Sequence, residues 1–253
     1  MVSHVDTPAI TNWTYASLKA KDAIADRFMD KVGRRPDSGP DRNRFVVNLY
    51  WRGDQCRLFI DTSGEKLSDR GYRKMPGKAP MQETLAAAVL MGAGYDPTRP
   101  MVNPMCGSGT LAIEAALMAA DRWPGSLRGN FGFMHIRGFD RAGWKVIRDR
   151  LCVRPKGRTI PPIMASDIDP RMVSAARQNA RTAGVDHLIA FSVCDFAETP
   201  MPQGQGGLVL LNPEYGLRLG DVTELEVTYK RIGDFFKQRC AGWTGGLFTG
   251  NLD

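Results

Sequence analysis

The sequence has little of what metal sites, disulfide frameworks and membrane spans require. Of its 253 residues, only five are cysteine and three are histidine. The cysteines are scattered with no CxxC pair, so they predict reduced thiols, mostly in the core, rather than a zinc site or disulfides. No apolar run approaches the ~20 residues of a membrane span, and the first 30 residues lack a secretory signal. These absences favour a cytoplasmic protein with no metal and no membrane partner.

An excess of basic residues distinguishes an otherwise ordinary composition. Hydrophobic residues make up 43% of the chain and charged residues 24%, which is typical of a globular protein. The formal net charge is +7. A basic surface suits a polyanion such as nucleic acid, but basic solvated faces also occur in proteins that bind none. Composition alone therefore leaves nucleic-acid binding open.

The first 60 residues predict a small α+β block. Residues 14–29 form an amphipathic helix with Leu18, Ala25 and Phe28 on one stripe, and a turn-rich basic linker follows at 33–44. Two strand-like runs, FVVNLY and RLFID, are joined through WRGDQ as a hairpin. A block of this size is expected to pack on another part of the chain.

From about residue 79, helices and strands alternate. Helices are expected at 81–93, 108–120, 171–184 and 222–240, and strands at 101–103, 161–167, 188–195, 207–213 and 245–250. This order predicts an α/β fold, a doubly wound and mostly parallel sheet with helices on both faces. An insertion rich in Arg, Gly and Trp, with one helix at 142–151, interrupts the order between 121 and 158.

Residues 101–116, MVNPMCGSGTLAIEAA, join a strand to a helix through a glycine turn. Gly107 and Gly109 have no Cβ, so the chain can turn sharply and a ligand can approach the backbone and the helix N-terminus. A lone G-x-G also occurs in turns that bind nothing. Ala112 can replace the third glycine of a dinucleotide site, but the next strand-end acid, Asp167, lies far beyond that motif's spacing of ~20 residues. A different nucleoside cofactor fits better.

Acidic residues end the next two strands. Asp167 lies at the tip of the second strand, where a carboxylate can accept both hydroxyls of a ribose. Asp169 and Pro170 are typical of a helix N-cap and first position. Asp195 ends the third strand and can accept from an exocyclic amine, while Phe196 can lie against an adenine ring. Such a pair is also typical of an ordinary turn.

The segment NPEYG, at 212–216, ends the fourth strand. Asn212 offers a side-chain carbonyl, Pro213 a fixed backbone and Tyr215 an aromatic face, a set that can grip a planar amine and stack its base. The alternative is a polar loop after a strand. All four candidate sites fall at the carboxyl ends of successive strands, where open α/β sheets bind ligands.

Taken together, PMCGSGT, SDIDP, CDF and NPEYG resemble the S-adenosylmethionine (SAM) methyltransferases that modify exocyclic amino groups. More narrowly, residues 61–87 (DTSGEKLSDRGYRKMPGKAPMQETLAA) are very similar to the signature of the large-subunit ribosomal RNA guanine-N2 methyltransferases that carry a THUMP RNA-binding domain. KDAIADRF and GRRP resemble the end of its THUMP region. The resemblance implies a partial THUMP-like region and linker at 1–60 and a Rossmann-like methyltransferase domain at 61–253, shorter at its C-terminus than the family pattern.

The resemblance also implies a role for each site. The cofactor would be SAM, contacted by Pro80, Thr84, Asn103, Met105, Cys106, Gly107, Ser108, Gly109, Asp167, Ile168, Asp195 and Phe196. The family's catalytic Asn-Pro-Pro-Tyr motif corresponds to Asn212, Pro213 and Tyr215, with Glu214 in place of the second proline. The implied reaction is transfer of a methyl group from SAM to the N2 amine of a guanine in 23S-type ribosomal RNA.

Two other interpretations stay open. DNA adenine-N6 and protein glutamine-N5 methylation share the Asn-Pro-Pro-Tyr logic, although the run at 61–87 argues against both. The other interpretation is a non-catalytic RNA-binding protein, which has lost methyl transfer through Glu214 and the short C-terminus. Ten basic residues are candidates to hold RNA phosphate: Arg34, Arg35, Arg42, Arg44, Arg70, Arg73, Lys74, Arg122, Arg128 and Arg137.

Overall fold

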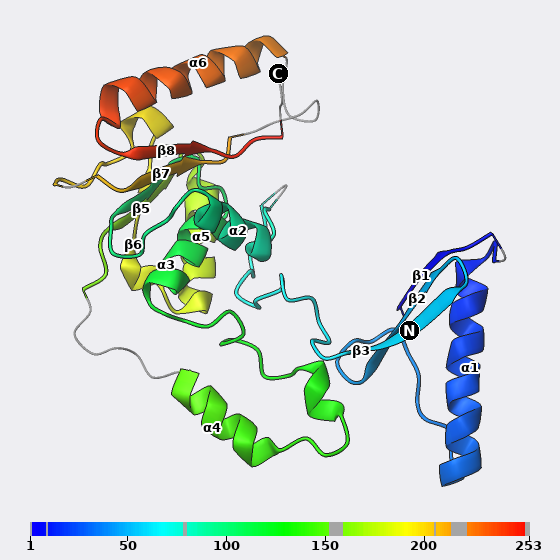
Figure 1. The fold of residues 1–253 in the computed structure, drawn as a ribbon. Coiled ribbons are helices and arrows are strands. Elements are labelled where there is room, and N and C mark those ends of the chain that lie inside the picture. The colour runs from blue at the N-terminus through cyan, green and yellow to red at the C-terminus, as the bar shows by residue number, and fades with distance from the viewer. Residues whose placement is uncertain are drawn as a thin grey trace. The chain divides into compact units, whose positions relative to one another are not determined.

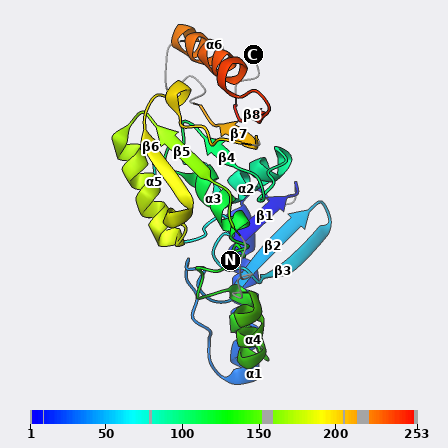
Figure 2. The same cartoon turned by 90° about the vertical axis from the view of Figure 1, so that its left-hand side faces the viewer.

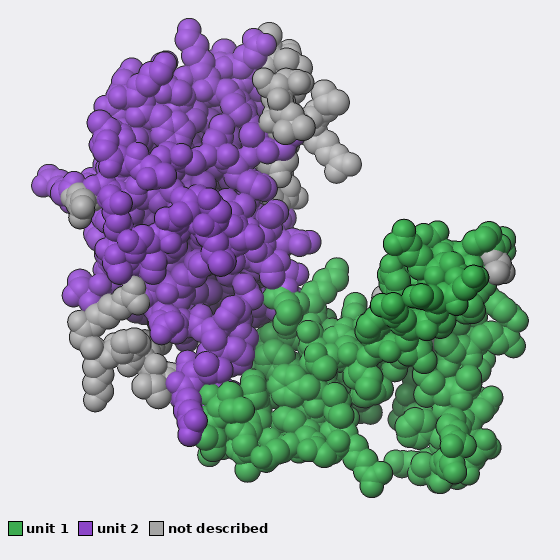
Figure 3. All heavy atoms as spheres, viewed as in Figure 1, with its two compact units in different colours: residues 1–67, 128–147 green, residues 68–127, 148–253 purple. Residues whose placement is uncertain are grey.

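Two separate β-sheets organise the chain, one of three strands and one of five (Figure 1 and Figure 2). The computed structural model describes residues 2–8, 10–77, 80–151, 159–204, 206–213 and 222–250. The chain divides into two compact units, coloured separately in Figure 3. Unit 1 comprises residues 1–67 and 128–147, and unit 2 comprises residues 68–127 and 148–253.

Unit 1 is built on the three-stranded sheet, in the order β1-β2-β3. β1 (Val2–Asp6) lies parallel to β2 (Val46–Arg52), which pairs antiparallel with β3 (Gln55–Asp61). The predicted hairpin is therefore confirmed. β1 has no counterpart among the predicted strands, because it is short and its partner strand follows only after the first helix, so no local pattern marks it.

Helix α1 (Trp13–Val32) connects β1 to β2 and confirms the first predicted helix. The Asn12 side chain accepts hydrogen bonds from two N–H groups of the first turn, which fixes where the helix begins. The predicted apolar stripe is only partly buried. Ala25 is buried, whereas Leu18 and Phe28 are 49% and 48% exposed.

Residues 128–147 of the insertion belong to unit 1 because they pack on the turn that follows β3. The backbone of Gly132 lies so close to the Asp61 carbonyl oxygen that any Cβ at this position would collide with it. The N–H group of Phe133 donates to the Thr62 carbonyl at 2.9 Å. Four aromatic rings form a cluster beside this contact, with centroids 5.0–5.8 Å apart: Phe131, Phe133, Phe139 and Trp144.

The Asp61 carboxylate fixes the turn itself. Its Oδ1 accepts the N–H groups of Ser63 and Gly64 at 2.8 and 3.0 Å, and its Oδ2 accepts from the Arg42 guanidinium at 3.0 Å. Burial by itself raises the pKa of Asp61, but these hydrogen bonds outweigh burial and hold the pKa below its usual value. Arg42 is therefore engaged inside unit 1 and is not a free phosphate ligand, contrary to the prediction.

Unit 2 is built on the five-stranded sheet, in the order β6-β5-β4-β7-β8, and every pair in it is parallel. The strands are β4 (Met101–Asn103), β5 (Ile163–Asp167), β6 (Ile189–Val193), β7 (Leu208–Leu211) and β8 (Thr244–Leu247). Four predicted helices are confirmed as α2 (Glu83–Gly92), α3 (Thr110–Ala119), α5 (Pro170–Ala183) and α6 (Val222–Arg239). The insertion helix is α4 (Arg141–Leu151), and single 3-10 turns are η1 (Gly132–His135), η2 (Asp186–Leu188) and η3 (Phe196–Glu198).

Helices cover both faces of this sheet, as the strand β7 shows most directly. Leu208 and Leu210 belong to the core formed with α2, α3 and α5, whereas Val209 and Leu211 belong to the core formed with α6. Successive side chains of a strand point to opposite faces, so a strand with helices on both sides has a continuous apolar sequence. The predicted doubly wound, Rossmann-like fold is confirmed.

We predict that Asp61→Asn destabilises the protein by about 1–2 kcal/mol at pH 7, because Asn keeps the shape but loses the charge that strengthens three hydrogen bonds. The pKa of Asp61 is lowered by folding, so its contribution is present above the unfolded pKa of about 3.9 and is lost as pH falls through the folded pKa. The melting-temperature difference should therefore shrink below about pH 4.

The matched control is Asp54→Asn at the exposed tip of the β2–β3 hairpin. This change should leave the melting temperature unchanged both at pH 7 and below about pH 4. Thermal unfolding followed by circular dichroism measures all three proteins. An Asp61→Asn protein as stable as the parent at pH 7 would contradict the role of this carboxylate.

Candidate active site

The loop after β4 turns sharply and is held against β5. Three of its residues have positive φ angles, at 54° for Met105, 54° for Gly107 and 86° for Gly109. The Cys106 N–H donates to the Ser166 carbonyl of β5 at 2.9 Å, which fixes the loop on the neighbouring strand. Helix α3 then starts at Thr110 with no side-chain cap, so no capping side chain satisfies its first N–H groups.

The two glycines of this loop have different roles. A Cβ built on Gly109 would lie 2.8 Å from the Ala176 Cβ of α5, so this glycine lets α3 and α5 approach each other. A Cβ built on Gly107 would meet nothing within 4 Å. The space above Gly107 is therefore open, and a small ligand can contact the backbone there.

Asp167 ties this loop to the tip of β5. One carboxylate oxygen accepts the Gly107 N–H at 2.9 Å and the other accepts the Asp169 N–H at 3.0 Å. A carboxylate has about four acceptor positions, so two remain for a ligand. The next side chain, Ile168, is 70% exposed and gives an apolar surface beside the carboxylate. Asp169 accepts the Arg171 N–H at 2.9 Å ahead of Pro170, which confirms the predicted helix start.

Two asparagines at the ends of neighbouring strands carry unsatisfied acceptors. Asn103 ends β4, is fully buried, and donates to the Leu210 carbonyl at 2.8 Å through its amide nitrogen. Asn212 follows β7, the strand beside β4. In the part of the chain that the structure describes, Asn103 Oδ1 and Asn212 Oδ1 are the only buried side-chain oxygens without a hydrogen-bond partner. A buried acceptor left without a donor is costly, so these two oxygens suit a ligand that supplies N–H or O–H groups.

Asp195 and Phe196 follow β6 and contact a side chain from α6. Asp195 accepts the Ala197 N–H at 2.9 Å, and both of its oxygens accept from Arg231 at 2.9 Å. Burial by itself raises the pKa of Asp195, but these hydrogen bonds outweigh burial and lower it, so the carboxylate stays ionised. The Phe196 ring is buried against Phe235, with centroids 6.0 Å apart, and the Arg231 guanidinium lies 4.8 Å from its centroid.

The side chain of Asn179, on α5, links the glycine loop to residues 74–75. Its side-chain oxygen accepts the N–H groups of Lys74 and Met75 at 2.9 and 3.0 Å, and its nitrogen donates to the carbonyls of Met75 and Ser108 at 3.0 and 3.1 Å. One buried amide therefore joins the glycine loop to residues 74–75. The sequence pattern did not single out Asn179, because an asparagine within an amphipathic helix usually lies on its exposed side.

The basic residues around this link are used internally. Arg70 pairs with the buried Glu114 at 3.3 Å, and the Tyr72 hydroxyl donates to the same carboxylate at 3.0 Å. Burial raises the pKa of Glu114 overall, although Arg70 and Tyr72 oppose that shift. Arg73 pairs with Glu83 at 3.1 Å.

These contacts correct part of the phosphate prediction. Four of the basic residues proposed to hold RNA phosphate instead bond to groups of the protein itself. Arg70 and Arg73 pair with carboxylates, as described above. Arg122 donates to the Ala183 carbonyl, and Arg128 donates to the Ser63 carbonyl. Guanidinium groups bound to buried carboxylates or carbonyls stabilise the fold rather than a ligand.

The model of the RMKL-like methyltransferase domain family, UPF0020, matches residues 70–253. The chain belongs to this family. Its fold matches SMU.472, assigned as a methyltransferase and solved in complex with SAH, with 28% identity and a TM-score of 0.86 over 99% of this chain and 66% of that one. The match to a predicted N6-adenine-specific DNA methylase from Listeria monocytogenes str. 4b F2365 has 31% identity and a TM-score of 0.81, over 98% of this chain and 64% of that one.

A more distant likeness is confined to the fold. TrmN from Thermus thermophilus is 19% identical with a TM-score of 0.62, over 98% of this chain and 61% of that one. The RMKL-like chain thus spans 61–66% of the length of these three proteins. The predicted SAM cofactor agrees with the family and with the SAH of SMU.472. The family match begins at residue 70, so the THUMP-like assignment of residues 1–60 stays a prediction.

The other predicted site residues of the RMKL-like domain lie in several settings. Pro80, three residues before α2, and Thr84, in the first turn of α2, are both exposed, and their predicted contact with the cofactor stays a prediction. Cys106 is buried, and burial raises the pKa of its thiol, while its predicted contact with the cofactor stays a prediction. Pro213 is buried directly after Asn212, whereas Glu214 and Tyr215 lie outside the described residues.

The described parts of the RMKL-like chain contain no cluster of three or more His, Cys, Asp or Glu that could hold a metal ion. None of the helices described is long and apolar enough to cross a membrane.

We predict that Gly107→Ala weakens SAM binding at least tenfold, because the new methyl group would enter the open space above the loop. A residue with a Cβ at positive φ costs about 1 kcal/mol of stability. Gly109→Ala incurs the same cost and also collides with Ala176, so its melting temperature should fall further. Gly94→Ala, at φ 71° with open space around it, is the control for the backbone cost alone.

Isothermal titration calorimetry measures the affinities and thermal unfolding the stabilities. If the space above Gly107 belongs to the cofactor, Gly94→Ala should bind SAM with the same affinity as the parent. Equal affinity in Gly107→Ala and Gly94→Ala would show that the space above Gly107 is not the cofactor's.

Proposed function

We propose that this chain forms the catalytic part of a SAM-dependent methyltransferase that modifies the exocyclic N2 amine of a guanine in 23S-type ribosomal RNA. The observation that carries the proposal is the pair of unsatisfied buried acceptors, Asn103 Oδ1 and Asn212 Oδ1, at the ends of adjacent strands. Acceptors held in this way suit amino groups, which are found both on SAM and on the target base.

The residues present suit each part of SAM. The open space above Gly107 and the start of α3 suit the methionine part, and Asn103 Oδ1 suits its amino group. The two remaining acceptor positions of Asp167 suit the ribose hydroxyls, and the exposed Ile168 suits a flat apolar ring. When bound, SAM supplies an electrophilic methyl group on a sulfonium centre.

The chain's own contribution to methyl transfer is positioning. Asn212 Oδ1 and the Pro213 carbonyl would accept the two hydrogens of the target amine and orient its nitrogen lone pair toward the sulfonium methyl. The nitrogen would take the methyl group as the sulfur–carbon bond breaks, SAH would be the leaving group, and the amine proton would pass to water. No strong base is needed before attack, because the proton becomes acidic only as nitrogen gains the methyl group. Alignment in one geometry supplies most of the acceleration.

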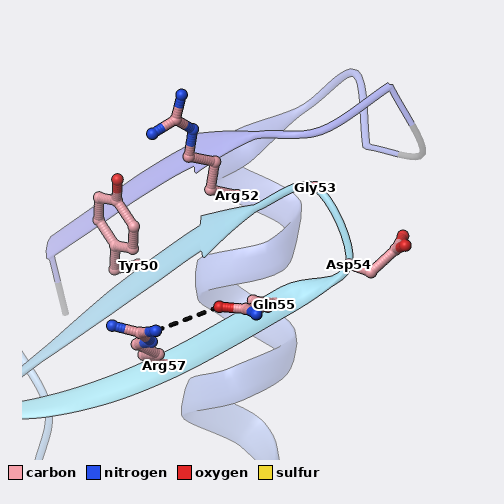
Figure 4. Close-up of a pocket in the computed structure, with 6 residues that line it drawn as sticks. All are labelled: Tyr50, Arg52, Gly53, Asp54, Gln55 and Arg57. Carbon is pink, nitrogen blue, oxygen red and sulfur yellow. Dashed lines mark hydrogen bonds between the residues drawn. The ribbon is translucent and has the colours of Figure 1, made fainter.

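Unit 1 offers a surface that suits RNA. A shallow hollow of about 540 Å³ lies on the β2–β3 hairpin, and Figure 4 shows Tyr50, Arg52 and Arg57 around it. His4 stacks on the Tyr50 ring with centroids 5.2 Å apart and an interplanar angle of 16°. Exposed guanidinium groups can bind phosphate, and an aromatic ring can stack on an unpaired base.

Transfer assays with several substrates test the proposal as a whole. The protein is incubated with labelled SAM and either unmodified large-subunit ribosomal RNA or double-stranded DNA, and the products are digested to nucleosides. We expect label in N2-methylguanosine from the RNA. Label in N6-methyladenine from the DNA would favour the activity named for the Listeria protein. SAM binding without transfer to either substrate would instead identify a non-catalytic protein.

We predict that Asn212→Ala lowers the rate of methyl transfer by on the order of 10²-fold, the scale expected when a group that positions the substrate is removed. SAM affinity and RNA affinity should change little, because other strand tips hold the cofactor and phosphate contacts dominate RNA binding. Asn43→Ala, in an exposed segment of unit 1, is the matched control for removal of an asparagine side chain. Transfer by Asn212→Ala at the parent's rate would contradict the catalytic assignment.

We predict that Arg52→Gln combined with Arg57→Gln weakens RNA binding about tenfold and lowers the salt slope by about one for each phosphate that is no longer bound. Arg27→Gln combined with Lys31→Gln, two exposed positions on α1, removes the same charge away from the hollow. Fluorescence anisotropy with a labelled ribosomal RNA fragment at several salt concentrations measures both. An equal decrease in affinity for the two double variants would show a general charge effect and no site at the hairpin.

A further inference from the structure

One side chain occupies both groups that are suited to recognise an adenine. The Arg231 Nη2 atom donates to both carboxylate oxygens of Asp195 at 2.9 Å each. The same guanidinium lies 4.8 Å from the centre of the Phe196 ring. Because a single planar group contacts the carboxylate and the ring face together, it fills the space that those two groups share.

The guanidinium group resembles the adenine edge in its chemistry. Both are planar, delocalised groups that carry an NH₂ donor, and both stack on aromatic rings. An adenine that donates its exocyclic amine to Asp195 and lies against Phe196 needs the volume that Arg231 fills. We propose that Arg231 takes the adenine's place in the free protein and is displaced when the adenosine part of the cofactor binds. This inference rests on the proposed SAM-dependent function and adds a residue that tunes cofactor affinity.

The surroundings allow the side chain to move while the helix stays in place. Phe235 packs edge-on against Phe196, and Arg239 donates to the Ala197 carbonyl, so α6 is attached to η3 by the residues one and two turns beyond Arg231. The Arg231 side chain is itself 50% exposed. It can therefore rotate into solvent while these anchors stay in place, and the Ala197 N–H still orients the Asp195 carboxylate.

The size of the effect follows from the exposure of the pair. A half-exposed ion pair and one cation–π contact are each modest interactions, so the need to break them hinders binding without preventing it. We expect removal of Arg231 to strengthen cofactor binding about threefold to tenfold. Arg231→Lys keeps a cation beside Asp195 but lacks the planar group over Phe196. Its affinity for the cofactor should therefore lie between those of the parent and of Arg231→Ala.

Calorimetry with SAH tests this proposal, because its sulfur is uncharged and a change in protein charge alters its binding little. The matched control is Arg171→Ala, which removes an equally charged arginine paired with the Asp169 carboxylate at another strand tip. We expect tighter SAH binding for Arg231→Ala and no change for Arg171→Ala. Circular dichroism and the melting temperature without SAH confirm that each variant is folded.

The possible outcomes distinguish a failure of the Arg231 proposal from a failure of the proposed SAM-dependent function. If the parent binds SAH and Arg231→Ala binds it equally well, Arg231 does not occupy the adenine position. Weaker binding would show instead that Arg231 holds the bound adenine, which also overturns the proposal. If no variant binds SAH, the cofactor assignment fails and this inference fails with it.

Discussion

The hydrogen bond from the Gly107 N–H to the Asp167 carboxylate is the contact on which the candidate site depends. It joins the loop after β4 to the tip of β5, so the Asp167 carboxylate lies beside Gly107 and the open space above it. The contact requires a backbone with φ of 54° at residue 107, and the space above it requires that no Cβ be present. The backbone conformation at Gly107 therefore sets both the shape of the glycine loop and the hydrogen bond that holds the Asp167 carboxylate beside it.

The rest of unit 2 keeps that conformation in place. Asn179 ties the loop to residues 74–75, and the close approach of Gly109 to Ala176 fixes α3 against α5. The buried Glu114 in this region accepts hydrogen bonds from Arg70 and Tyr72. Among the buried side-chain oxygens that the structure describes, those of Asn103 and Asn212 alone lack a partner. Natural proteins tolerate such violations mainly at functional sites, which is why these two residues carry the functional argument.

Much of the fold could be predicted from the sequence because its signals are local. The alternation of apolar runs placed every strand of the five-stranded sheet, and Asp169 with Pro170 placed the start of α5. The parallel order of strands then predicted that their polar tips meet at one edge. The charged residues were predicted less well. Arg42 and Arg70 look like phosphate ligands in the sequence but bind carboxylates within their own units.

By itself, the sequence determined the order of helices and strands in the five-stranded unit, the SAM-dependent methyltransferase class, and which strand ends carry polar side chains. Those properties depend on neighbours within a few positions or on motifs that stay together along the chain. Tertiary structure alone decided that Gly107 lines open space while Gly109 packs against a helix, and that Asn179 braces the loop. It also brought Arg231 to Asp195, 36 positions away. These outcomes depend on which segments meet when both sheet faces are covered, and no local pattern encodes that distance.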